Sequence, residues 1–348
     1  MKIGGVSLEH PVALAPMAGM TDTAFRRLVK RMGGCGLVVT EMVSSEGLVR
    51  GIDRTLEYAE YTEEERPVSI QVFGGTPHVM AEAARIVEGM GADIVDVNMG
   101  CPVPKIAKHS AGCSLMREPE HAASVVRAMV DAVKIPVTVK MRAGWNEHEI
   151  NAPELARMVE DAGASGVAVH GRTAAQSYSG ESDWSLIGRV AEGVRIPVFG
   201  SGDCVEAEDV GTRLAGSRAS GVLVGRGALR NPWIFRQAAD AAAGRVLRLA
   251  SAEERGQFLL DYMDLLLHER VHEQAGFRHT APGQAEAGAP ARGRERWVIN
   301  KLRALGSWYT KGLDGGSHLR VAINSTESIS QLREVIARFF LEARALSA

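Results

Sequence analysis

The chain has 348 residues, of which 45% are hydrophobic and 24% are charged. Its 40 lysines and arginines nearly balance 42 aspartates and glutamates, and the net charge of -2 excludes a chain that coats nucleic acid through bulk positive charge. The four cysteines form no CxxC pair, which argues against a disulfide framework and a cysteine-rich zinc site. Apolar runs all fall short of the roughly 20 residues of a membrane helix, and residues 1–11 lack the apolar core of a signal peptide, so we expect a cytoplasmic protein.

Eight short apolar runs, rich in β-branched residues, recur through the first part of the chain with helical patterns between them. Their bounds are 12–18, 37–42, 68–73, 94–98, 137–142, 166–170, 197–200 and 221–225. Continuous apolar runs are typical of buried parallel strands. Eight such strands alternating with helices predict a (β/α)8 TIM barrel over residues 1–244. A doubly wound open sheet is the competing fold, but residues 12–20 contain no GxGxxG fingerprint after the first strand.

From residue 245 onward the pattern is helical, which predicts a small all-helical C-terminal domain over residues 245–348. Ser251, with two glutamates close behind it, marks the start of the first helix of this domain. Two further helices are expected at 295–311 and 327–346. Residues 276–293 hold almost no large apolar side chains, so we expect a mobile loop there.

Functional side chains stand at the carboxyl end of every predicted strand, where barrel active sites lie. In chain order they are Met17, Glu41, Gln71, Asn98 with Cys101, Lys140 with Arg142, His170 with Arg172, Asp203 and Arg226. Any one of them alone is more often a structural hydrogen-bond partner. Together they predict a polar pocket large enough for a cofactor and a substrate.

The loops after the seventh and eighth strands are where barrels usually bind phosphate. Here they read Gly200-Ser201-Gly202-Asp203 and Gly225-Arg226-Gly227, which offer bare backbone N–H groups beside an arginine. Asn231-Pro232 then opens a helix, whose N-terminus also favours an anion. The loops predict a cofactor that carries phosphate, with Lys140 placing a positive charge near an electron-rich ring.

Six stretches of the chain resemble the tRNA-dihydrouridine synthases, especially the bacterial B type. They are APMAGMTD at 15–22, QVFGG at 71–75, DVNMGCPVPK at 96–105, VKMRAGW at 139–145, VHGRT at 169–173 and VGRGALRNPWIF at 224–235. The resemblance extends over about residues 2–345 and is most specific in the NMGCP stretch. It implies an FMN-binding barrel, a helical domain that binds tRNA, and NADPH as electron donor. The implied reaction is reduction of the C5–C6 double bond of specific uridines in tRNA to dihydrouridine.

The resemblance also implies roles for the residues at the motif positions. The positions matching FMN contacts are Pro16, Met17, Ala18, Gln71, Lys140 and His170, and those matching the phosphate loops are Ser201, Gly202, Asp203, Gly225 and Arg226. The positions where uracil or nearby phosphates would be contacted are Asn98, Arg142 and Arg172. The thiol acid of the family matches Cys101.

Two positions depart from the family pattern. The seventh-strand motif is usually Asn-Gly-Asp, and here Ser201 offers a hydroxyl of shorter reach, so a weaker flavin contact is expected. The helical domain usually carries Arg-Lys-His just before Trp-Tyr, where this chain has Arg303-Ala304-Leu305 before Trp308 and Tyr309. Some RNA contacts expected from the family are therefore missing.

The chemistry of uracil reduction explains why a cysteine is expected in the pocket. The reaction needs a hydride, which a reduced flavin supplies, and a proton delivered from the opposite side of the ring. An ordinary thiol stays mostly protonated at neutral pH and can donate that proton. Cys101 lies between Gly100 and Pro102 on a turn just past the fourth strand, which makes it the predicted acid.

The helical domain carries a local excess of positive charge. Seven basic and two acidic residues lie between Arg292 and Arg320, and seven minus two leaves +5 in a chain of net charge -2. A solvated helix face gives the same pattern, but phosphate contacts would use such a surface. Arg303 and Lys311 are the predicted tRNA contacts within it.

Three alternatives from other classes remain open at this point. Residues 268–272 read HERVH, which matches the HExxH zinc-protease motif with Glu269 as general base. The extended metzincin pattern fails because Ala275 and Arg278 stand where it requires glycine and histidine, so a solvated helix face is favoured. A flavin barrel acting on a small molecule leaves the helical domain unexplained, and a pure RNA-binding module leaves the flavin-type strand ends unexplained.

Overall fold

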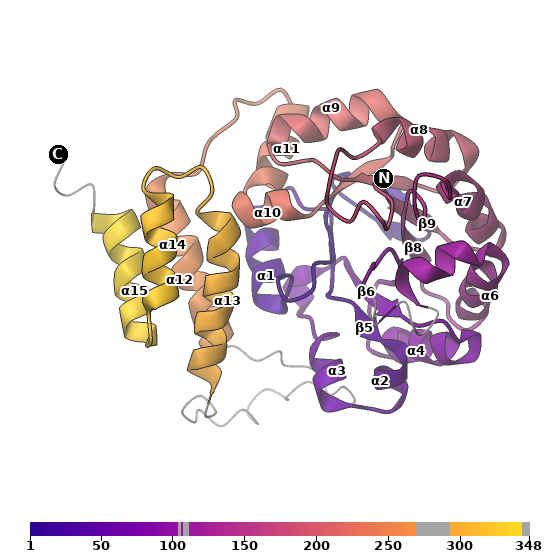
Figure 1. Cartoon of the computed structure of the whole chain (residues 1–348), viewed down its shortest axis with the longest axis horizontal. Helices are drawn as coiled ribbons and strands as arrows, with labels where there is room; N and C mark the ends of the chain where they lie inside the picture. The colour runs from indigo at the N-terminus through magenta and orange to yellow at the C-terminus, as the bar shows by residue number, and fades with distance from the viewer. Residues whose placement is uncertain (104–105, 107–110, 269–292, 343–348) are drawn as a thin grey trace.

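The structure, a computed structural model, describes residues 1–103, 106, 111–268 and 293–342. A ring of parallel strands surrounded by helices forms the larger part, and a bundle of helices packs against one side of it (Figure 1). The predicted TIM barrel followed by helices is confirmed. The expected boundary at 244/245 falls in the linker between the last barrel helix, α11 (Ile234–Ala242), and the first bundle helix, α12 (Ala252–His268).

The barrel consists of eight parallel strand positions that close into a ring. The second position is divided, because β4 pairs with the first and third positions while β5 extends only the third. The strands are β3 (Val12–Leu14), β4 (Leu37–Val39) with β5 (Val43–Ser44), β6 (Val68–Phe73), β7 (Ile94–Met99), β8 (Val137–Arg142), β9 (Gly166–His170), β10 (Val198–Ser201) and β11 (Gly221–Val224). Each of the eight predicted runs therefore overlaps a strand.

Helices cover the outside of the ring and complete each strand–helix unit. Their packing against the strands forms an apolar core of Val, Leu, Ile and Ala side chains that continues into the bundle. The barrel helices are α1 (Thr23–Met32), α2 (Ser45–Val49), α3 (Asp53–Glu57), α4 (Pro77–Gly89), α6 (Pro119–Val130), α7 (Ala152–Asp161), α8 (Trp184–Gly193), α9 (Ala207–Ser217), α10 (Arg226–Arg230) and α11, with short 3-10 turns at Glu63–Glu65 and Gly112–Arg117.

A two-stranded hairpin at the N-terminus, β1 (Lys2–Ile3) with β2 (Val6–Ser7), was not predicted. Ile3 and Leu8 are buried in a small cluster with side chains from inside the barrel, including Ile94 and Phe199. These contacts lie near the amino ends of the strands, so the hairpin closes the end of the barrel opposite the functional side chains.

Among the residues that the structure describes, the bundle has one more helix than the sequence predicts. The expected helices at 295–311 and 327–346 correspond to α13 (Arg294–Tyr309) and to α15 (Ile329–Ala337) with the π turn Arg338–Glu342. Between them lies α14 (Gly316–Ser325). The glycines at its start are typical of a loop, so the sequence pattern does not indicate a helix there. Gly315 adopts φ +66°, and a Cβ on Gly316 would lie 2.2 Å from the Thr310 carbonyl oxygen, so both glycines shape the turn into α14.

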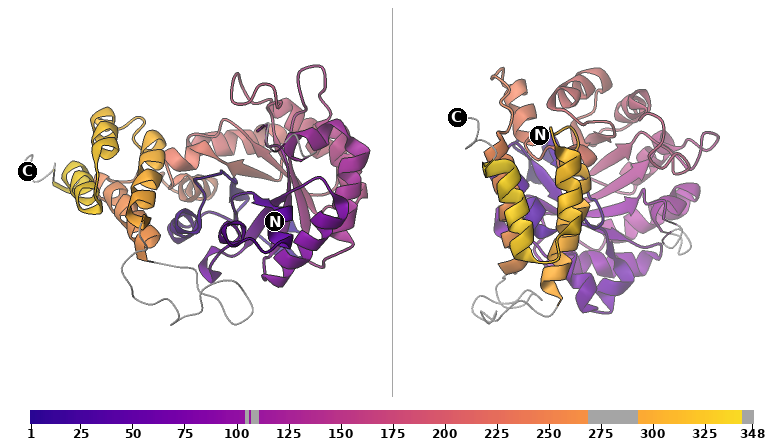
Figure 2. Two further views of the ribbon diagram at one scale, coloured as in Figure 1. Left: turned by 60° about the horizontal axis from the view of Figure 1, so that its bottom comes forward. Right: turned by 60° about the vertical axis from the view of Figure 1, so that its left-hand side comes forward.

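Aromatic rings join the bundle to the barrel. Phe25 on α1 makes edge contacts with Phe258 and Tyr262 on α12, at centroid distances of 6.0 and 6.1 Å. Phe258 also stacks on Tyr309 of α13 at 5.7 Å. Figure 2 shows the bundle against the α1 and α10 side of the barrel in both views. The two parts therefore share one core.

Several sequence predictions fall on residues outside the described ranges. The predicted loop at 276–293 is represented only by Gly293, and of the HERVH stretch only the backbone of His268, the last residue of α12, is described. Within the described ranges, three or more potential metal ligands do not gather anywhere into a cluster that could hold an ion. The helices seen there also lack the length and apolar character that crossing a bilayer requires.

Candidate active site

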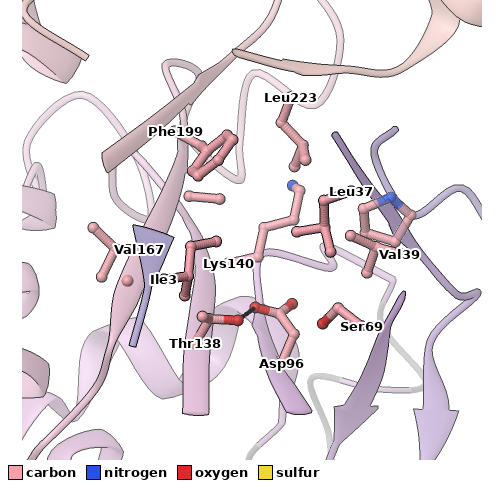
Figure 3. Close-up of a pocket in the computed structure, with 13 residues that line it drawn as sticks. Ile3, Leu37, Val39, Ser69, Asp96, Thr138, Lys140, Val167, Phe199 and Leu223 are labelled. Atoms are coloured by element: carbon pink, nitrogen blue, oxygen red, sulfur yellow. Dashed lines mark hydrogen bonds between the residues drawn. The ribbon is translucent and has the colours of Figure 1, made fainter. Parts of the chain in front are cut away.

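A chain of polar side chains crosses three neighbouring strands inside the barrel. Thr138 on β8 donates to Asp96 Oδ1 on β7 (2.6 Å), and Gln71 Nε2 on β6 donates to Asp96 Oδ2 (2.6 Å). Asn98 Nδ2 in turn donates to Gln71 Oε1 (2.7 Å). Figure 3 shows the first of these bonds, between Thr138 and Asp96. We call these four residues the amide relay.

The amide relay ends at the backbone beside the predicted acid. Asn98 Oδ1 accepts hydrogen bonds from the N–H groups of Gly100 (3.2 Å) and Cys101 (3.0 Å). The Cys101 carbonyl accepts from Cys113 N–H (3.1 Å), so the turn is held on both sides of the thiol. At one end of the relay, the backbone N–H groups require that Asn98 present its oxygen. At the other end, the Asp96 carboxylate requires that Gln71 present its NH2 group. Both ends therefore impose the same orientation on the two amides.

Lys140 lies inside the barrel below the strand ends. Figure 3 shows its side chain extending among Phe199, Leu37 and Leu223, next to a cavity of about 30 Å³. Burial, and then the positive charge of Arg142, lower the pKa of Lys140 to about 8, although Asp96 acts in the opposite direction. These surroundings destabilise the ammonium, so an anionic or electron-rich partner would stabilise it strongly.

His170, at the end of β9, lies within a group of positive charges. Burial lowers its pKa to about 2, followed in effect by the charges of Lys140, Arg142, Arg172 and Arg226. Its Nε2 is 3.4 Å from the Arg172 guanidinium, which can only donate, so the unprotonated nitrogen faces the arginine. The site therefore combines a neutral imidazole with converging cations, which suits an anionic ligand.

We expect His170 to make the flavin-free protein sensitive to acid. A histidine that is neutral when folded but has a pKa near 6.5 when unfolded adds stability above pH 6.5, and this stability is lost progressively as the pH falls below that value. At pH 5 the loss amounts to about 2 kcal/mol of unfolding free energy. Urea unfolding between pH 5 and 7 measures it. His170→Gln should flatten this dependence, whereas His148→Gln, whose side chain is 85% exposed, should leave it unchanged.

Arg172, a predicted substrate contact, is 3% exposed and holds the loop that follows β9. It donates to the carbonyls of Ser179 (3.1 Å) and Gly180 (2.6 Å), and it pairs with Asp203 at 2.7 Å. Burial alone would raise the pKa of Asp203, but the Ser182 N–H and Arg172 hold it below its usual range. The observed partners of Arg172 belong to the barrel, and its contact with substrate stays a prediction.

Arg142 has a similar role on the neighbouring strand. It is 3% exposed and donates to the carbonyls of Gly100, Thr173 and Ser177, each at 2.8 Å. It thereby ties the turn that carries Cys101 to the loop after β9. Arg142 and Arg172 together fix the pocket wall, and the substrate contact of Arg142 stays a prediction.

The predicted phosphate loops adjoin each other at the ends of β10 and β11. Gly202 and Asp203 adopt positive φ values of 118° and 56°, which turn the backbone sharply after β10. Gly225 precedes α10, whose first N–H groups have no acceptors within the helix. The Ser201 hydroxyl donates to the Leu223 carbonyl (3.0 Å) and is thus engaged between the two strands, and its weak flavin contact stays a prediction.

Other predicted flavin contacts lie beside these loops. Pro16 lines the barrel cavity together with Lys140, and Met17 and Ala18 follow it at the end of the first strand position. The Met17 sulfur lies 3.6 Å from where a Cβ on Gly225 would stand. The structure thus brings the first strand end and the last phosphate loop together.

Tyr178, beside Arg142 and Arg226, is a feature of the site that the sequence did not predict. It is 60% exposed, and its ring lies 4.9 Å from the Arg226 guanidinium and 5.8 Å from that of Arg142. Arg226 also lies 6.0 Å from the Trp308 ring of the bundle. The only sequence signal was an aromatic residue in a loop of small polar residues, which has no periodicity to mark it.

The predicted tRNA contacts in the bundle differ in their availability. Arg303 donates to the Thr326 carbonyl (2.8 Å) within the bundle. Lys311 is exposed, with its ammonium 3.9 Å from the Trp308 ring. Lys301, which contributes to the net charge of +5 between residues 292 and 320, points toward the barrel and is largely buried. The charge available to a partner is therefore smaller than the sequence count.

Comparisons with known proteins agree over nearly the whole chain. "Probable tRNA-dihydrouridine synthase" of Rickettsia conorii is 37% identical over 344 residues, covering 98% of this chain and 96% of that protein. The protein of the same name from Rhodobacter capsulatus is 43% identical over 270 residues, covering 77% and 83%. "tRNA-dihydrouridine synthase B" of Xanthomonas axonopodis is 36% identical over 329 residues, covering 94% and 92%.

The solved structure of TcOYE with pHBA has the same fold, with a TM-score of 0.51 at 10% identity, covering 69% of this chain and 92% of that one. The sequence model of the family described as "Dihydrouridine synthase (Dus)" matches residues 13–304. That match includes all barrel strands except the first residue of β3, together with the amide relay, Cys101 and most of α13. The chain therefore belongs to the dihydrouridine synthase family.

Proposed function

We propose that this tRNA-dihydrouridine synthase holds FMN at the ends of its barrel strands, accepts electrons from NADPH, and protonates the reduced uracil with Cys101. Synthase activity follows from membership of the family, which also implies a flavin. The identity of the flavin, the electron donor and the acid belong to the proposal. The observation that carries it is the amide relay, which fixes the thiol-bearing turn beside buried Lys140 and the cations around the neutral His170.

The residues present fit a flavin that ends in a single phosphate. The cations that converge on His170, which include the buried ammonium of Lys140, favour an anionic group among them. Backbone turns at Gly202 and Gly225 adjoin Arg226, which suits one phosphate group. The chain has no GxGxxG fingerprint after the first strand for an adenosine-bearing half, which favours FMN over FAD.

When bound, the flavin supplies a hydride to C6 of the uracil. The chain's own task is to deliver a proton to C5 from the other side. The Cys101 Sγ–H bond breaks, a C5–H bond forms, and the sulfur recovers its proton from solvent afterwards. Asn98 holds the Cys101 N–H and Arg142 holds the Gly100 carbonyl, so the thiol has a fixed position when the base enters.

The pocket can reach only a base that has left its stack. Enzymes that modify bases within folded RNA extrude the target nucleotide into the active site. Tyr178 and Arg226 stand at the pocket edge, and Arg226 faces Trp308 of the bundle, beside which lies exposed Lys311. This arrangement suits an RNA partner that contacts both parts of the protein. The uracil contacts of Asn98, Arg142 and Arg172 remain part of this proposal.

The decisive experiment is reconstitution with defined components. Purified protein should be yellow, release FMN on denaturation, and form dihydrouridine in unmodified tRNA when supplied with NADPH, as measured by mass spectrometry of the digested RNA. Protein that releases FAD, or that cannot be reconstituted with FMN, would refute the cofactor assignment. If the FMN-loaded protein is active with NADH and inactive with NADPH, only the assignment of the electron donor is refuted.

We expect Lys311→Glu to weaken tRNA binding and to lower its dependence on salt. A lysine that contacts a phosphate releases counterions, so removing it reduces the slope of log K against log salt by about 1. Electrophoretic or fluorescence titrations at several salt concentrations measure both quantities. Lys2→Glu makes the same charge change on the hairpin at the closed end of the barrel and should bind tRNA normally. Equal losses in both variants would indicate an effect of net charge alone.

A further inference from the structure

Lys301 of α13 reaches from the bundle into the barrel. Its ammonium donates to the Gly19 carbonyl (2.8 Å) and lies 2.9 Å from Asp22 Oδ2 and 3.7 Å from Glu41 Oε1. Its side chain is 13% exposed, and those of Asp22 and Glu41 are 15% and 6% exposed. A largely buried charge with three barrel partners is a structural contact rather than part of an RNA-facing surface. We call this group the Lys301 clamp.

The clamp holds both sides of Gly19. The Gly19 N–H donates to Glu41 Oε2 (2.5 Å) while its carbonyl accepts from Lys301. Gly19 adopts φ +79°, a conformation that a side chain would strain. Tyr262 of α12 donates to Asp22 Oδ2 (2.8 Å), so two bundle helices converge on the same turn of the barrel.

Hydrogen bonds transmit the position of Gly19 to Met17. The Met17 carbonyl accepts from the N–H groups of Met20 (3.0 Å) and Thr21 (3.1 Å), and the Met17 N–H donates to Thr21 Oγ1 (3.0 Å). Residues 17–21 therefore form one compact turn. Met17 and Ala18 are the positions expected to contact the flavin, and they lie in that turn directly before Gly19.

The charges of Asp22 and Glu41 stabilise the position of the Lys301 ammonium in the clamp. Burial alone would lower the pKa of Lys301, but Asp22 and Glu41 raise it above its usual value. The lysine is therefore charged throughout the neutral range. Removing it would leave two buried carboxylates without their shared cation and the Gly19 carbonyl without its donor.

We propose that Lys301 is a positioning residue for the cofactor, which acts from the helical domain to hold the Met17–Gly19 turn in its flavin-binding shape. The inference rests on the proposed binding of FMN. It makes a distinct claim, that a residue of the bundle with no place in the flavin pocket controls flavin affinity. The helical domain would then complete the cofactor site in addition to any part it has in binding RNA.

Titration of flavin-free protein with FMN, followed by quenching of flavin fluorescence, tests the clamp. Lys301→Met should raise the Kd about tenfold, and Lys301→Arg, which restores the charge and its donors, should recover most of the loss. Arg333→Met is the matched control, since it removes an ion pair with Asp264 that is 44% exposed and lies within the bundle. It should bind FMN as the wild type does. FMN should also raise the Tm of Lys301→Met less than that of the wild type, because weaker binding stabilises less.

The outcomes separate the two proposals. If Lys301→Met is folded by circular dichroism and its Kd stays within about twofold of the wild-type value, less than 0.5 kcal/mol, the clamp has no role in cofactor binding. If that variant does not fold, Glu41→Gln decides, because it keeps the side-chain shape and an acceptor for the Gly19 N–H but loses the charge. Weakened FMN binding in Glu41→Gln supports the clamp, and an unchanged Kd overturns it. A wild-type protein that fails to bind FMN would overturn the proposed cofactor, and the clamp with it.

Discussion

Cys101→Ala is expected to separate the two half-reactions of the enzyme. Reduction of the flavin by NADPH requires no proton from the thiol and should proceed at a nearly normal rate. Reoxidation by tRNA requires that proton and should slow by about 10²–10⁴-fold, the usual cost of losing a general acid. Single-turnover stopped flow, with each half-reaction followed by flavin absorbance, measures both rates.

The structure makes this substitution a clean test. The turn is held through the Cys101 N–H to Asn98 and through the Cys101 carbonyl to Cys113 N–H, and both bonds survive when the thiol is removed. Cys101→Ser should stall at the same step, because a hydroxyl is a much poorer acid than a thiol. Cys113→Ala, a buried cysteine in the same region, should leave both steps largely intact. If Cys101→Ala is reoxidised by tRNA at the wild-type rate, another group supplies the proton.

Lys140→Met should lose flavin or reduce it slowly, with an expected fall of about 10²–10³-fold in the rate of reduction, as when one preorganised charge is removed from an active site. The wild-type rate should decline as the pH rises, because the ammonium gives up its proton. Since the pKa of Lys140 in the flavin-free protein is about 8, and an anionic partner raises it, the decline should begin no lower than about pH 8. Stopped-flow reduction with NADPH between pH 6.5 and 10 gives the profile.

Two variants support the interpretation of that profile. Lys140→Arg keeps its charge to higher pH and should retain the reduction rate where the wild type loses it. Lys134→Met changes an exposed lysine just before the same strand and should behave as the wild type. His170 cannot produce a decline near pH 8, since its pKa is about 2 and it is neutral throughout that range. A wild-type profile that stays flat to pH 10, together with a normal reduction rate in Lys140→Met, would contradict a role for the Lys140 charge.

Much of the fold could be predicted from the sequence because barrel strands are short, apolar and regularly spaced. The third, fifth and sixth predicted runs have the bounds of β6, β8 and β9. The first run was predicted to end at Ala18, but β3 ends at Leu14 because the chain turns at Met17 instead of continuing the ladder. The hairpin of β1 and β2 was missed because strands of two residues are too short to show any alternation.

The positions of site residues on strands could be predicted from the sequence, whereas the contacts that loops make with them could not. Position toward the carboxyl end of a strand was enough to group Gln71, Asn98 and Lys140 at one end of the barrel. The partners of Arg142 and Arg172 depend on how residues 173–180 fold back over the pocket, which no local pattern reveals. Net charge along a segment likewise failed for Lys301, because only tertiary packing shows which face of α13 meets the barrel.

The amide relay has a second consequence, which concerns the stagger of the strands. Gln71 and Asp96 are register partners between β6 and β7, and Asp96 and Thr138 are register partners between β7 and β8. Apolar side chains tolerate a slip of two residues, since a slipped strand still presents them to the interior. The hydrogen bonds of the relay do not tolerate such a slip, because Gln71 and Thr138 would no longer face the Asp96 carboxylate. The side chains that orient the thiol therefore also lock the shear of the barrel across three strands, and a substitution among them would disturb assembly as well as chemistry.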